Sequence, residues 1–347
     1  MKVFKVYHRS SHHASVSGYN QLTQYGEDSL ISATPKYIPY RVAKYISQRT
    51  DQDAGIYDSN SVFKDINLTI KILKYGIRAK TIHYLNAERD IRIASILKPF
   101  LHKTKVCATF HKPPSILKTQ ISNTTYLSKL DGAIVVGSNQ VSFIKETFGL
   151  DNVKYIPHGV DVHFFKPSKD VFKSSNKPNI LFVGQHLRDF DTLNKVIKVF
   201  ENKNQSIIFN IVLREDFRNN VCDSPIVNVF SNIDDYKLLE LYQKATLLYL
   251  PLKDSTACNS ILEAMACGLP IITTKVGGNS DYLSNTSSIL LDPATVQDSV
   301  TVITKVINSQ ELQKHMSLSV RKKAVDCFSW KIISKSISQF YHELHNK

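Results

Sequence analysis

The sequence predicts an α/β protein made of two doubly wound domains, each a parallel sheet with helices on both faces. Short apolar segments that suit buried strands alternate with amphipathic segments that suit helices through both halves of the chain. With 347 residues the chain is also too long for one ordinary hydrophobic core. We therefore expect one domain over residues 1–170, a second over 171–329 and a final helix over 330–347.

Segments in the first half predict a parallel sheet and its helices. Apolar or alternating runs predict strands over 2–7, 79–85, 105–110, 131–136 and 153–156. Apolar residues at helical spacing predict a helix over 62–76, which Gly76 ends, and a second helix is expected over 138–148. The Lys, Ser, Asn and Pro composition of 168–178 then indicates a linker.

The second half repeats this alternation. Strands are predicted over 179–183, 206–213, 226–230, 247–252, 271–274 and 288–291. Helices are predicted over 191–200, 234–244, 259–267 and 295–327, and a last one starts at Trp330.

The clearest unit of the chain lies in residues 247–283. Its first strand ends near Pro251, and after a polar loop Asn259 and Ser260 can cap a helix that Gly268 ends. A helix that starts at the carboxyl end of a parallel strand presents free amide groups and a partial positive charge. The unit therefore suits a bound diphosphate, although a purely structural strand–helix–strand unit would show the same pattern.

The run ILEAMACGLPIITTKVGG, residues 261–278, resembles the donor-binding signature of GT-B glycosyltransferases in the large retaining family 4. The resemblance implies two Rossmann-like domains facing across a cleft, with the final helix crossing back to the first domain. In that family two glutamates frame the motif, the first contacting the donor sugar and the second the ribose. Glu263 matches the second, whereas Ser255, next to Asp254, occupies the position of the first. The chain thus departs from the family pattern at the sugar contact.

The resemblance also implies a donor site for a nucleoside diphosphate sugar. Family members place an arginine directly after the glycine at position 184; here Gln185 stands there, so Arg188 becomes the expected cation for the diphosphate. A surface arginine is the alternative. The predicted donor-binding residues are Gly18, Gly184, Arg188, Ile233, Ser255, Thr256, Ala257, Cys258, Asn259 and Glu263.

A histidine in the first half completes the predicted site. The strand over 105–110 delivers His111 ahead of two prolines that end the strand, and family members have a histidine that approaches the transferred sugar from this position. We expect His111, Arg188 and Glu263 to be the catalytic residues. His83 and Glu88 flank the end of the preceding strand, where a functional role and a buried core imidazole are equal alternatives for His83.

Neither a metal nor a cofactor is expected. The five cysteines show no ligand or redox spacing, which suggests reduced, buried thiols, and no acidic pair of the DxD type stands in a loop. His8, His12 and His13 have no carboxylate or cysteine partner at ligand spacing, which favours surface histidines. Arg188 and the amides of residues 256–259 would instead neutralise the leaving diphosphate.

The net charge of +14 is concentrated in the first half, since residues 1–170 alone carry +11. A helix over 88–98 would surround apolar side chains with basic ones, which suits an anionic membrane surface as well as a buried core. The basic residues are Arg89, Arg92, Lys98, Lys103 and Lys105, and the apolar ones are Ile91, Ile93, Ile96, Leu97, Phe100 and Leu101. No aromatic and basic motif for nucleic acid accompanies the charge.

Together with these observations, the resemblance implies a retaining, metal-independent hexosyltransferase. It would move a hexose from a nucleoside diphosphate sugar to a glycan or lipid-linked acceptor in surface polysaccharide synthesis. No apolar segment is long enough to span a membrane and the N-terminus lacks a signal region, so we expect a cytoplasmic protein, peripheral on the inner face of the membrane. A GT-B nucleotide-sugar epimerase and a non-catalytic nucleotide-sugar-binding module are the alternatives.

Overall fold

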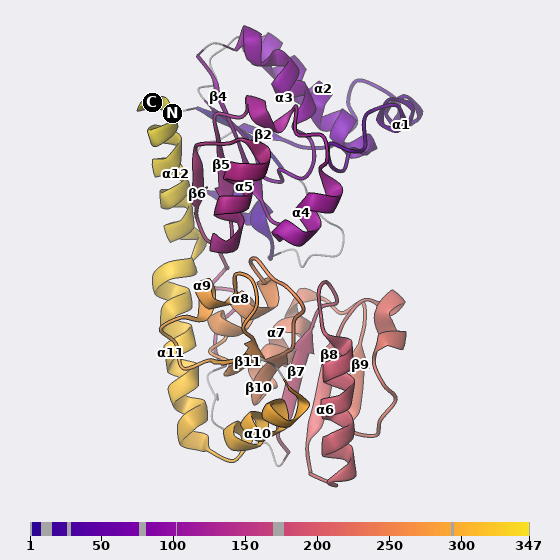
Figure 1. Cartoon of the computed structure of the whole chain (residues 1–347), viewed down its shortest axis with the longest axis vertical. Coiled ribbons are helices and arrows are strands. Elements are labelled where there is room, and N and C mark those ends of the chain that lie inside the picture. Colours follow the sequence, from indigo (N-terminus) through magenta and orange to yellow (C-terminus); the bar gives the residue numbers. More distant parts are fainter. Residues whose placement is uncertain are drawn as a thin grey trace. The chain divides into compact units, whose positions relative to one another are not determined.

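The computed structural model of the chain contains two compact α/β units (Figure 1). It describes residues 2–7, 16–25, 29–75, 81–101, 103–168, 177–292 and 295–346. The first unit takes the described residues up to His158, except 16–18, and those from Ile333 onwards. The second unit takes 16–18 and Gly159–Ile332. The chain therefore leaves the first unit at His158, earlier than the change in composition near residue 170 suggested.

The first unit is built on a six-stranded parallel sheet of order β2-β1-β3-β4-β5-β6. Its strands are β1 Val3–Val6, β2 Ser29–Ile31, β3 Thr81–Tyr84, β4 Lys105–Phe110, β5 Gly132–Val135 and β6 Val153–Tyr155. Its helices are α1 Tyr40–Gln48, α2 Ser59–Tyr75, α3 Arg92–Leu97, α4 Pro114–Gln120 and α5 Val141–Phe148, with short 3-10 turns η1 Tyr19–Gln24, η2 Lys98–Phe100, η3 Leu127–Lys129 and η4 Ser138–Gln140. The strands are mostly apolar because helices cover both faces of a parallel sheet.

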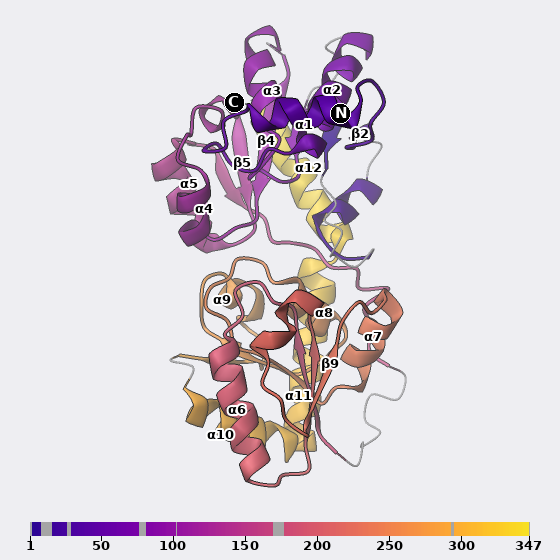
Figure 2. The same ribbon diagram turned by 90° about the vertical axis from the view of Figure 1, so that its right-hand side faces the viewer.

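The second unit is built on another six-stranded parallel sheet, of order β12-β11-β10-β7-β8-β9. Its strands are β7 Asn179–Val183, β8 Ile208–Val212, β9 Val227–Phe230, β10 Leu247–Leu250, β11 Ile271–Thr274 and β12 Ile289–Leu291. Its helices are α6 Phe190–Asn202, α7 Asp235–Lys244, α8 Asn259–Ala266, α9 Asn279–Leu283, α10 Val296–Ile307 and α11 Gln310–Phe328, with the 3-10 turn η5 Glu215–Asn220. Figure 2 looks towards β9 and shows α6 and α7 on opposite sides of it, so the predicted doubly wound α/β architecture is confirmed.

The last helix, α12 Trp330–Asn346, starts where the sequence predicted and belongs to the first unit from Ile333 onwards. Its residues Phe340 and Leu344 pack against Gly132 of β5, where a Cβ atom would lie 2.7 Å from a Leu344 methyl carbon. Tyr341 adds a hydrogen bond from the same helix to His83 of β3. The helix is therefore packed against the first sheet.

Two predicted elements of the first half differ from the structure. The helix over 88–98 starts only at Arg92, because Asp90 adopts a left-handed backbone (φ 68°) and its carboxylate pairs with buried Lys64 from α2. The helix over 62–76 starts earlier, at Ser59. Gly76, which was expected to end it, and residues 79 and 80 of the predicted strand lie outside the described residues, as does most of the predicted linker.

The segment after Gly159 is anchored to the second unit. Val160, Val162 and Phe165 are buried in the second hydrophobic core. The Arg321 guanidinium of α11 donates to the carbonyls of Val162, Phe165 and Ala266, at 3.1, 3.1 and 2.5 Å. These contacts explain why the chain joins the second unit before the linker.

We predict that Gly159→Ala destabilises the second unit. A Cβ atom at this position would lie 2.4 Å from the indole ring of buried Trp330, and overpacking of this kind costs about 1–3 kcal/mol. Trp330 is the single tryptophan of the chain, so its fluorescence during urea unfolding reports on this region. Gly149→Ala is the control, because its Cβ would meet no atom within 4 Å and would add only left-handed backbone strain in the first unit. Equal urea midpoints for wild type and Gly159→Ala would contradict this packing account.

Candidate functional site

The carboxyl ends of β7 and β10 meet in the middle of the second sheet. From β7 the chain continues outwards to β8 and β9, and β10 then returns to pair with β7 on its other side. Ligands of open α/β sheets bind at such a point, where the strand order reverses. The two loops are hydrogen-bonded to one another: the Lys253 amide donates to the Leu187 carbonyl (2.9 Å) and the Asp189 amide to the Pro251 carbonyl (3.0 Å). The segments predicted to bind the diphosphate are thus neighbours.

Arg188 lies at this point with its guanidinium against the start of α8. It donates to the carbonyl of Val183 from Nε and Nη2 (3.1 and 2.9 Å) and to the Ser260 hydroxyl from Nη2 (3.1 Å). Gly184 makes room for it, because a Cβ atom on this residue (φ 91°) would lie 2.7 Å from Nη2. The structure therefore brings together Gly184, Arg188 and the first turn of α8.

The start of α8 is not capped as the sequence suggested. Asn259 is the first helical residue, and Cys258, which precedes it, makes no side-chain capping bond. The Ser260 hydroxyl donates instead to the Val183 carbonyl of β7 (3.2 Å). Capping by Asn259 and Ser260 is therefore wrong, because a contact with the neighbouring strand takes the hydroxyl.

The loop between β11 and α9, which contains Gly277 and Gly278, packs tightly against the loop before α8. A Cβ atom on Gly277 (φ 48°) would lie 1.9 Å from the Ser255 carbonyl oxygen, and one on Gly278 would lie 2.5 Å from that of Thr256. Ser255 and Thr256 are buried, while Asp254 at their side accepts from the Ser255 amide (2.7 Å). The glycines of the signature thus allow two backbones to touch at the edge of the site.

Glu263 lies one turn into α8 and is buried. Its Oε1 accepts a short hydrogen bond from the Ser17 hydroxyl and its Oε2 accepts from the Tyr242 hydroxyl of α7 (2.8 Å). Burial, only partly offset by these hydrogen bonds, raises the pKa of the carboxyl to about 7. Sequence reasoning missed Ser17 and Tyr242, because no local motif marks either partner.

The residues around Glu263 enclose a small cavity of about 10 Å³. Its lining includes Ser17 and Gly18 of the segment after β1, together with Gly159 and Trp330. Gly18 has φ 92°, a backbone conformation that favours glycine. The predicted Gly18 and Glu263 are therefore in the same place within the second unit.

The remaining predicted donor contacts lie farther along the same edge of the sheet. Ile233 follows β9 and precedes α7, whose first turn is capped by the Asp234 carboxylate. Ile233 and Ala257 are half-buried and pack against the second hydrophobic core, whereas Cys258 is buried within it. Ile233 and Ala257 can offer a donor only apolar or backbone contacts, whereas the Cys258 sulfur lies 3.6 Å from Arg188 Nη2.

His111 follows β4 in the first unit and is held by its neighbours. Its Nε2 lies 2.7 Å from the Leu85 carbonyl oxygen, and because a carbonyl can only accept, Nε2 carries the proton. The ring makes edge contacts with Tyr19 (4.8 Å between centroids) and His158 (6.2 Å). The structure thus fixes both the direction and the tautomer of the imidazole.

Glu88 holds the backbone of this turn. Its Oε1 accepts from the amides of both His111 (2.6 Å) and Lys112 (2.7 Å), and the side chain is only 1% exposed. Within the described chain its Oε2 has no hydrogen-bond partner. A buried carboxylate of this kind orients the loop, and its place at the carboxyl end of β3 was the signal in the sequence.

His83 is a core residue, which resolves the alternatives left by the sequence. The side chain is fully buried, with Nδ1 2.6 Å from the Tyr341 hydroxyl and Nε2 2.8 Å from the Thr109 hydroxyl. Burial lowers the pKa of the imidazole well below its ordinary value. His83 therefore links β3, β4 and α12 as a neutral hydrogen-bonding group.

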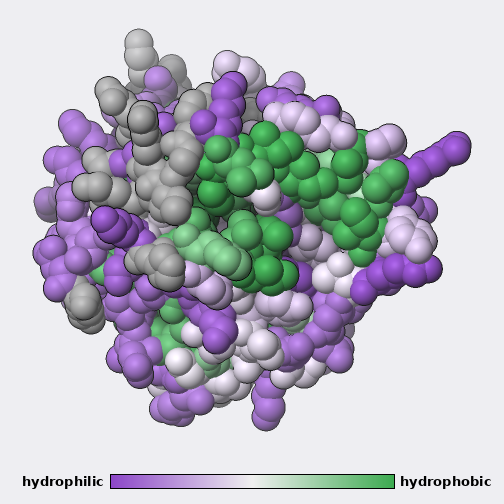
Figure 3. Space-filling model, turned by 90° about the horizontal axis from the view of Figure 1, so that it is seen from above, coloured by the Kyte–Doolittle hydropathy of each residue, from purple (hydrophilic) through white to green (hydrophobic). Residues whose placement is uncertain are grey.

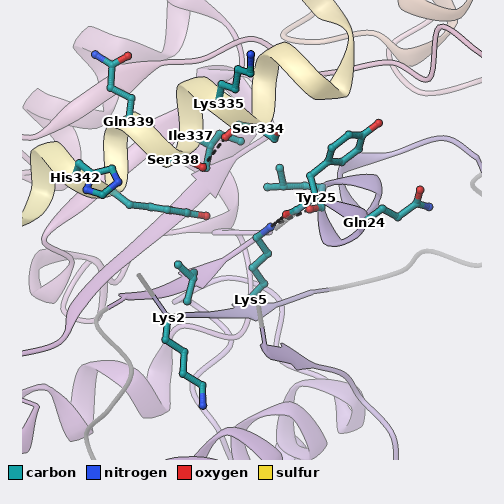
Figure 4. Close-up of a pocket in the computed structure, with 13 residues that line it drawn as sticks. Lys2, Lys5, Gln24, Tyr25, Ser334, Lys335, Ile337, Ser338, Gln339 and His342 are labelled. Carbon is teal, nitrogen blue, oxygen red and sulfur yellow. Dashed lines mark hydrogen bonds between the residues drawn. The ribbon is translucent and has the colours of Figure 1, made fainter. Parts of the chain in front are cut away.

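A larger cavity of about 1100 Å³ lies beside β1 and α12 in the first unit (Figure 4). Buried Lys5 donates there to the carbonyls of Leu22 and Tyr25, both at 2.9 Å, and so ties η1 to the sheet. None of the residues predicted from the sequence lines this cavity. We assign no ligand to it, because residues 26–28, which continue from its rim at Tyr25, lie outside the described chain.

The described part of the chain has neither a metal-binding cluster nor a membrane-spanning helix. No group of three or more His, Cys, Asp or Glu side chains there could hold a metal ion, and His8, His12 and His13 lie outside it. Among the helices in that part, none is both long and apolar enough to cross a membrane.

Comparison with known proteins finds a family match within the second unit. Residues 165–323 match the family model described as glycosyl transferases group 1. Among curated proteins, the MMP alpha-(1->4)-mannosyltransferase of Mycolicibacterium hassiacum is 25% identical over 122 residues, which cover 35% of this chain and 30% of that protein. The chain spans half or less of the length of the curated relatives it matches.

Solved structures match over both units. Sucrose-phosphate synthase from Thermosynechococcus elongatus has a TM-score of 0.72 at 16% identity, covering 99% of this chain and 98% of that one. Anabaena HepE in complex with UDP and glucose has a TM-score of 0.65 at 14% identity, covering 99% and 100%. With the two parallel sheets, these matches show that the chain has the GT-B fold and that its residues 165–323 are similar to glycosyl transferases group 1.

Proposed function

We propose that the protein is a retaining glycosyltransferase that moves a hexose from a nucleoside diphosphate sugar to a glycan or lipid-linked acceptor. The observation that carries this proposal is the buried Glu263 carboxylate one turn into α8, the helix whose first turn contacts Arg188 through Ser260. A mannosyltransferase among the curated relatives and a similar fold solved with UDP and glucose support a sugar-nucleotide donor.

In this proposal the second unit binds the donor. Glu263 accepts hydrogen bonds from the ribose, and the base lies towards Ile233. The diphosphate faces Arg188 and the amide-rich start of α8, where the guanidinium and the helix dipole oppose its charge without a metal ion. Ser255 and the neighbouring Asp254 stand nearest to the sugar.

The chemical step needs no covalent intermediate on the protein. The bond between the anomeric carbon and the diphosphate oxygen breaks while the acceptor oxygen bonds to the same face of that carbon. The acceptor proton moves to the leaving phosphate oxygen, so charge and configuration are both accounted for. His111, held by Glu88, would contact the sugar hydroxyls, and Arg188 would stabilise the charge that develops on the diphosphate.

A non-catalytic nucleotide-sugar-binding module is the second candidate, favoured by one observation. Ser255 is buried and has no carboxylate with which to contact the sugar, unlike the glutamate of the family pattern. Such a module would bind the donor but form no product.

A screen of nucleotide sugars tests the proposed function. The melting temperature should rise with one class of nucleoside diphosphate sugar, because a ligand that binds only the folded state stabilises it. Product formed with that donor and a panel of glycan and lipid-linked acceptors should keep the anomeric configuration of the donor when examined by NMR. Inversion would exclude the proposed step, conversion of donor alone would indicate an epimerase, and binding without product would favour the binding module.

We predict that Glu263→Gln weakens donor binding by about 1.5–3 kcal/mol, the value of a hydrogen bond to a charged group. The amide has nearly the same volume as the carboxylate, so the fold should be retained. Isothermal titration calorimetry with the donor found in the screen measures the loss, and Glu311→Gln, an exposed site on α11, is the matched control. Unchanged affinity in Glu263→Gln would remove this residue from the donor site.

The same variant should change how stability depends on pH. Because burial raises the pKa of Glu263 from 4.5 in the unfolded chain to about 7, the folded protein binds more protons between these values. This stabilising effect is complete below pH 4.5 and is lost as the pH rises through 7. At about 1.4 kcal/mol per pH unit the loss approaches roughly 3 kcal/mol, and Glu263→Gln should abolish it. Urea unfolding at pH 5 and pH 8 measures the change in the free energy of unfolding between these pH values. The same change in wild type and in Glu263→Gln would contradict the raised pKa.

Arg188 and His111 should have separable effects. Arg188→Ala should reduce turnover by about 10²–10³-fold, the cost of losing one donor that stabilises transition-state charge, and should also weaken binding of the nucleoside diphosphate. His111→Ala should reduce turnover while leaving nucleoside diphosphate affinity near wild type, because this residue belongs to the first unit. Full activity in both variants would show the catalytic assignment to be wrong.

A further inference from the structure

Among the large apolar side chains that the first unit exposes to solvent, three belong to the neighbouring elements α2, α3 and η2. Leu73 of α2 is 77% exposed, Ile96 of α3 58% and Phe100 of η2 70%. Figure 3 shows a broad band of apolar side chains on the face that it views. We call Leu73, Ile96 and Phe100 the apolar patch. A contiguous patch of exposed apolar side chains marks an interaction surface, whereas single exposed apolar side chains do not.

The patch is the outer side of helices whose inner sides form the core. Ile72, Ile93 and Leu97 of the same elements are partly buried and pack against the first hydrophobic core, and α2 packs against α3. The helices are therefore held in place without the patch, and the exposed side chains are not needed to complete the fold.

Within residues 88–105, which the sequence suggested for a membrane surface or a buried core, the structure shows which side chains are buried and which are exposed. Ile91 and Leu101 are only 4% exposed, and the Arg92 guanidinium donates to the carbonyls of Asp51 (2.7 Å) and Gly55 (2.9 Å). These residues are core, which corrects the view that the whole segment is amphipathic. Leu73, by contrast, comes from a different helix and was not part of that prediction.

The charge on the same elements is positive. Lys74 and Lys103 are exposed, whereas the Lys105 ammonium, whose side chain is 31% exposed, lies 3.8 Å from a carboxylate oxygen of Asp131. The acidic residues within the described part of 71–105 are Glu88 and Asp90, which are 1% and 2% exposed. The helices that carry the patch therefore present basic but not acidic side chains to solvent, a combination that suits an anionic surface.

We propose that Leu73, Ile96 and Phe100 dock the first unit on an anionic lipid bilayer, with the apolar side chains in the headgroup region and Lys74 and Lys103 against the lipid phosphates. The docking deepens the proposed function, on which it rests for a lipid-linked acceptor, because it would hold the enzyme where such an acceptor resides. A bilayer fits better than a protein partner because the elements that carry the patch combine protruding apolar side chains with exposed basic ones, while the acidic side chains of the same segment are buried.

Vesicle sedimentation tests the proposal with the full chain. Wild type should sediment with vesicles of phosphatidylcholine and phosphatidylglycerol, remain in the supernatant with phosphatidylcholine alone, and bind less at high salt. Ile96→Ser combined with Phe100→Ser should reduce binding at least tenfold. Leu318→Ser, on α11 in the second unit and 61% exposed in the wild type, should bind as wild type does.

Two controls make the outcome interpretable. Circular dichroism and the donor-induced melting shift should be the same in the double variant and wild type, so a failure of docking is distinct from a failure of donor binding. Wild type that stays in the supernatant with anionic vesicles, or a double variant that sediments like wild type, would overturn the proposal. A concentration-dependent dimer that the double variant abolishes, without vesicle binding, would overturn it in favour of an interface with a second copy.

Discussion

The pairing of β10 with β7 is the constraint on which the rest of the candidate site depends. It places the carboxyl ends of two strands side by side although β8, β9 and α7 separate them in the sequence. The loop after β7 then supplies a guanidinium, and the loop after β10 leads into a helix whose start has no side-chain cap. Both loops keep this arrangement because Gly184 leaves space for Arg188 and Gly277 leaves space for a neighbouring carbonyl. A Cβ atom at position 184 would lie 2.7 Å from Arg188 Nη2 and would push the guanidinium away from its place at the start of α8.

A buried carboxylate within this arrangement is costly unless other groups bind it. Glu263 is placed on the inner side of α8, and two hydroxyl groups donate to it, one from Ser17 and one from Tyr242. These bonds offset only part of the desolvation, which is why its pKa stays above the ordinary value. A buried carboxyl group with an elevated pKa is a good candidate for ligand binding, since a ligand hydroxyl could donate a further hydrogen bond to the carboxylate.

The sequence predicts the architecture well because its main signals are local. Strands covered on both faces are continuously apolar, so β7 and β11 begin and end where expected, and α12 starts at Trp330 as predicted. The same holds for the signature itself, whose glycines act through nearby backbone contacts. Local patterns fail where a distant residue decides the outcome. Lys64 pairs with Asp90, so that α3 starts later than predicted, and the Ser260 hydroxyl donates to the Val183 carbonyl instead of capping the start of α8.

The partners of the predicted site residues could not be predicted for the same reason. Ser17 is 246 positions from Glu263, and nothing in its own surroundings marks it as a ligand of that carboxylate. Hydrogen–deuterium exchange tests most directly whether a nucleoside diphosphate sugar binds at the carboxyl ends of β7 and β10. A donor that raises the melting temperature should slow amide exchange in residues 184–189 and 254–263. Slower exchange confined to residues 334–342, beside the larger cavity at Lys5, with no change in those two segments, would contradict the account.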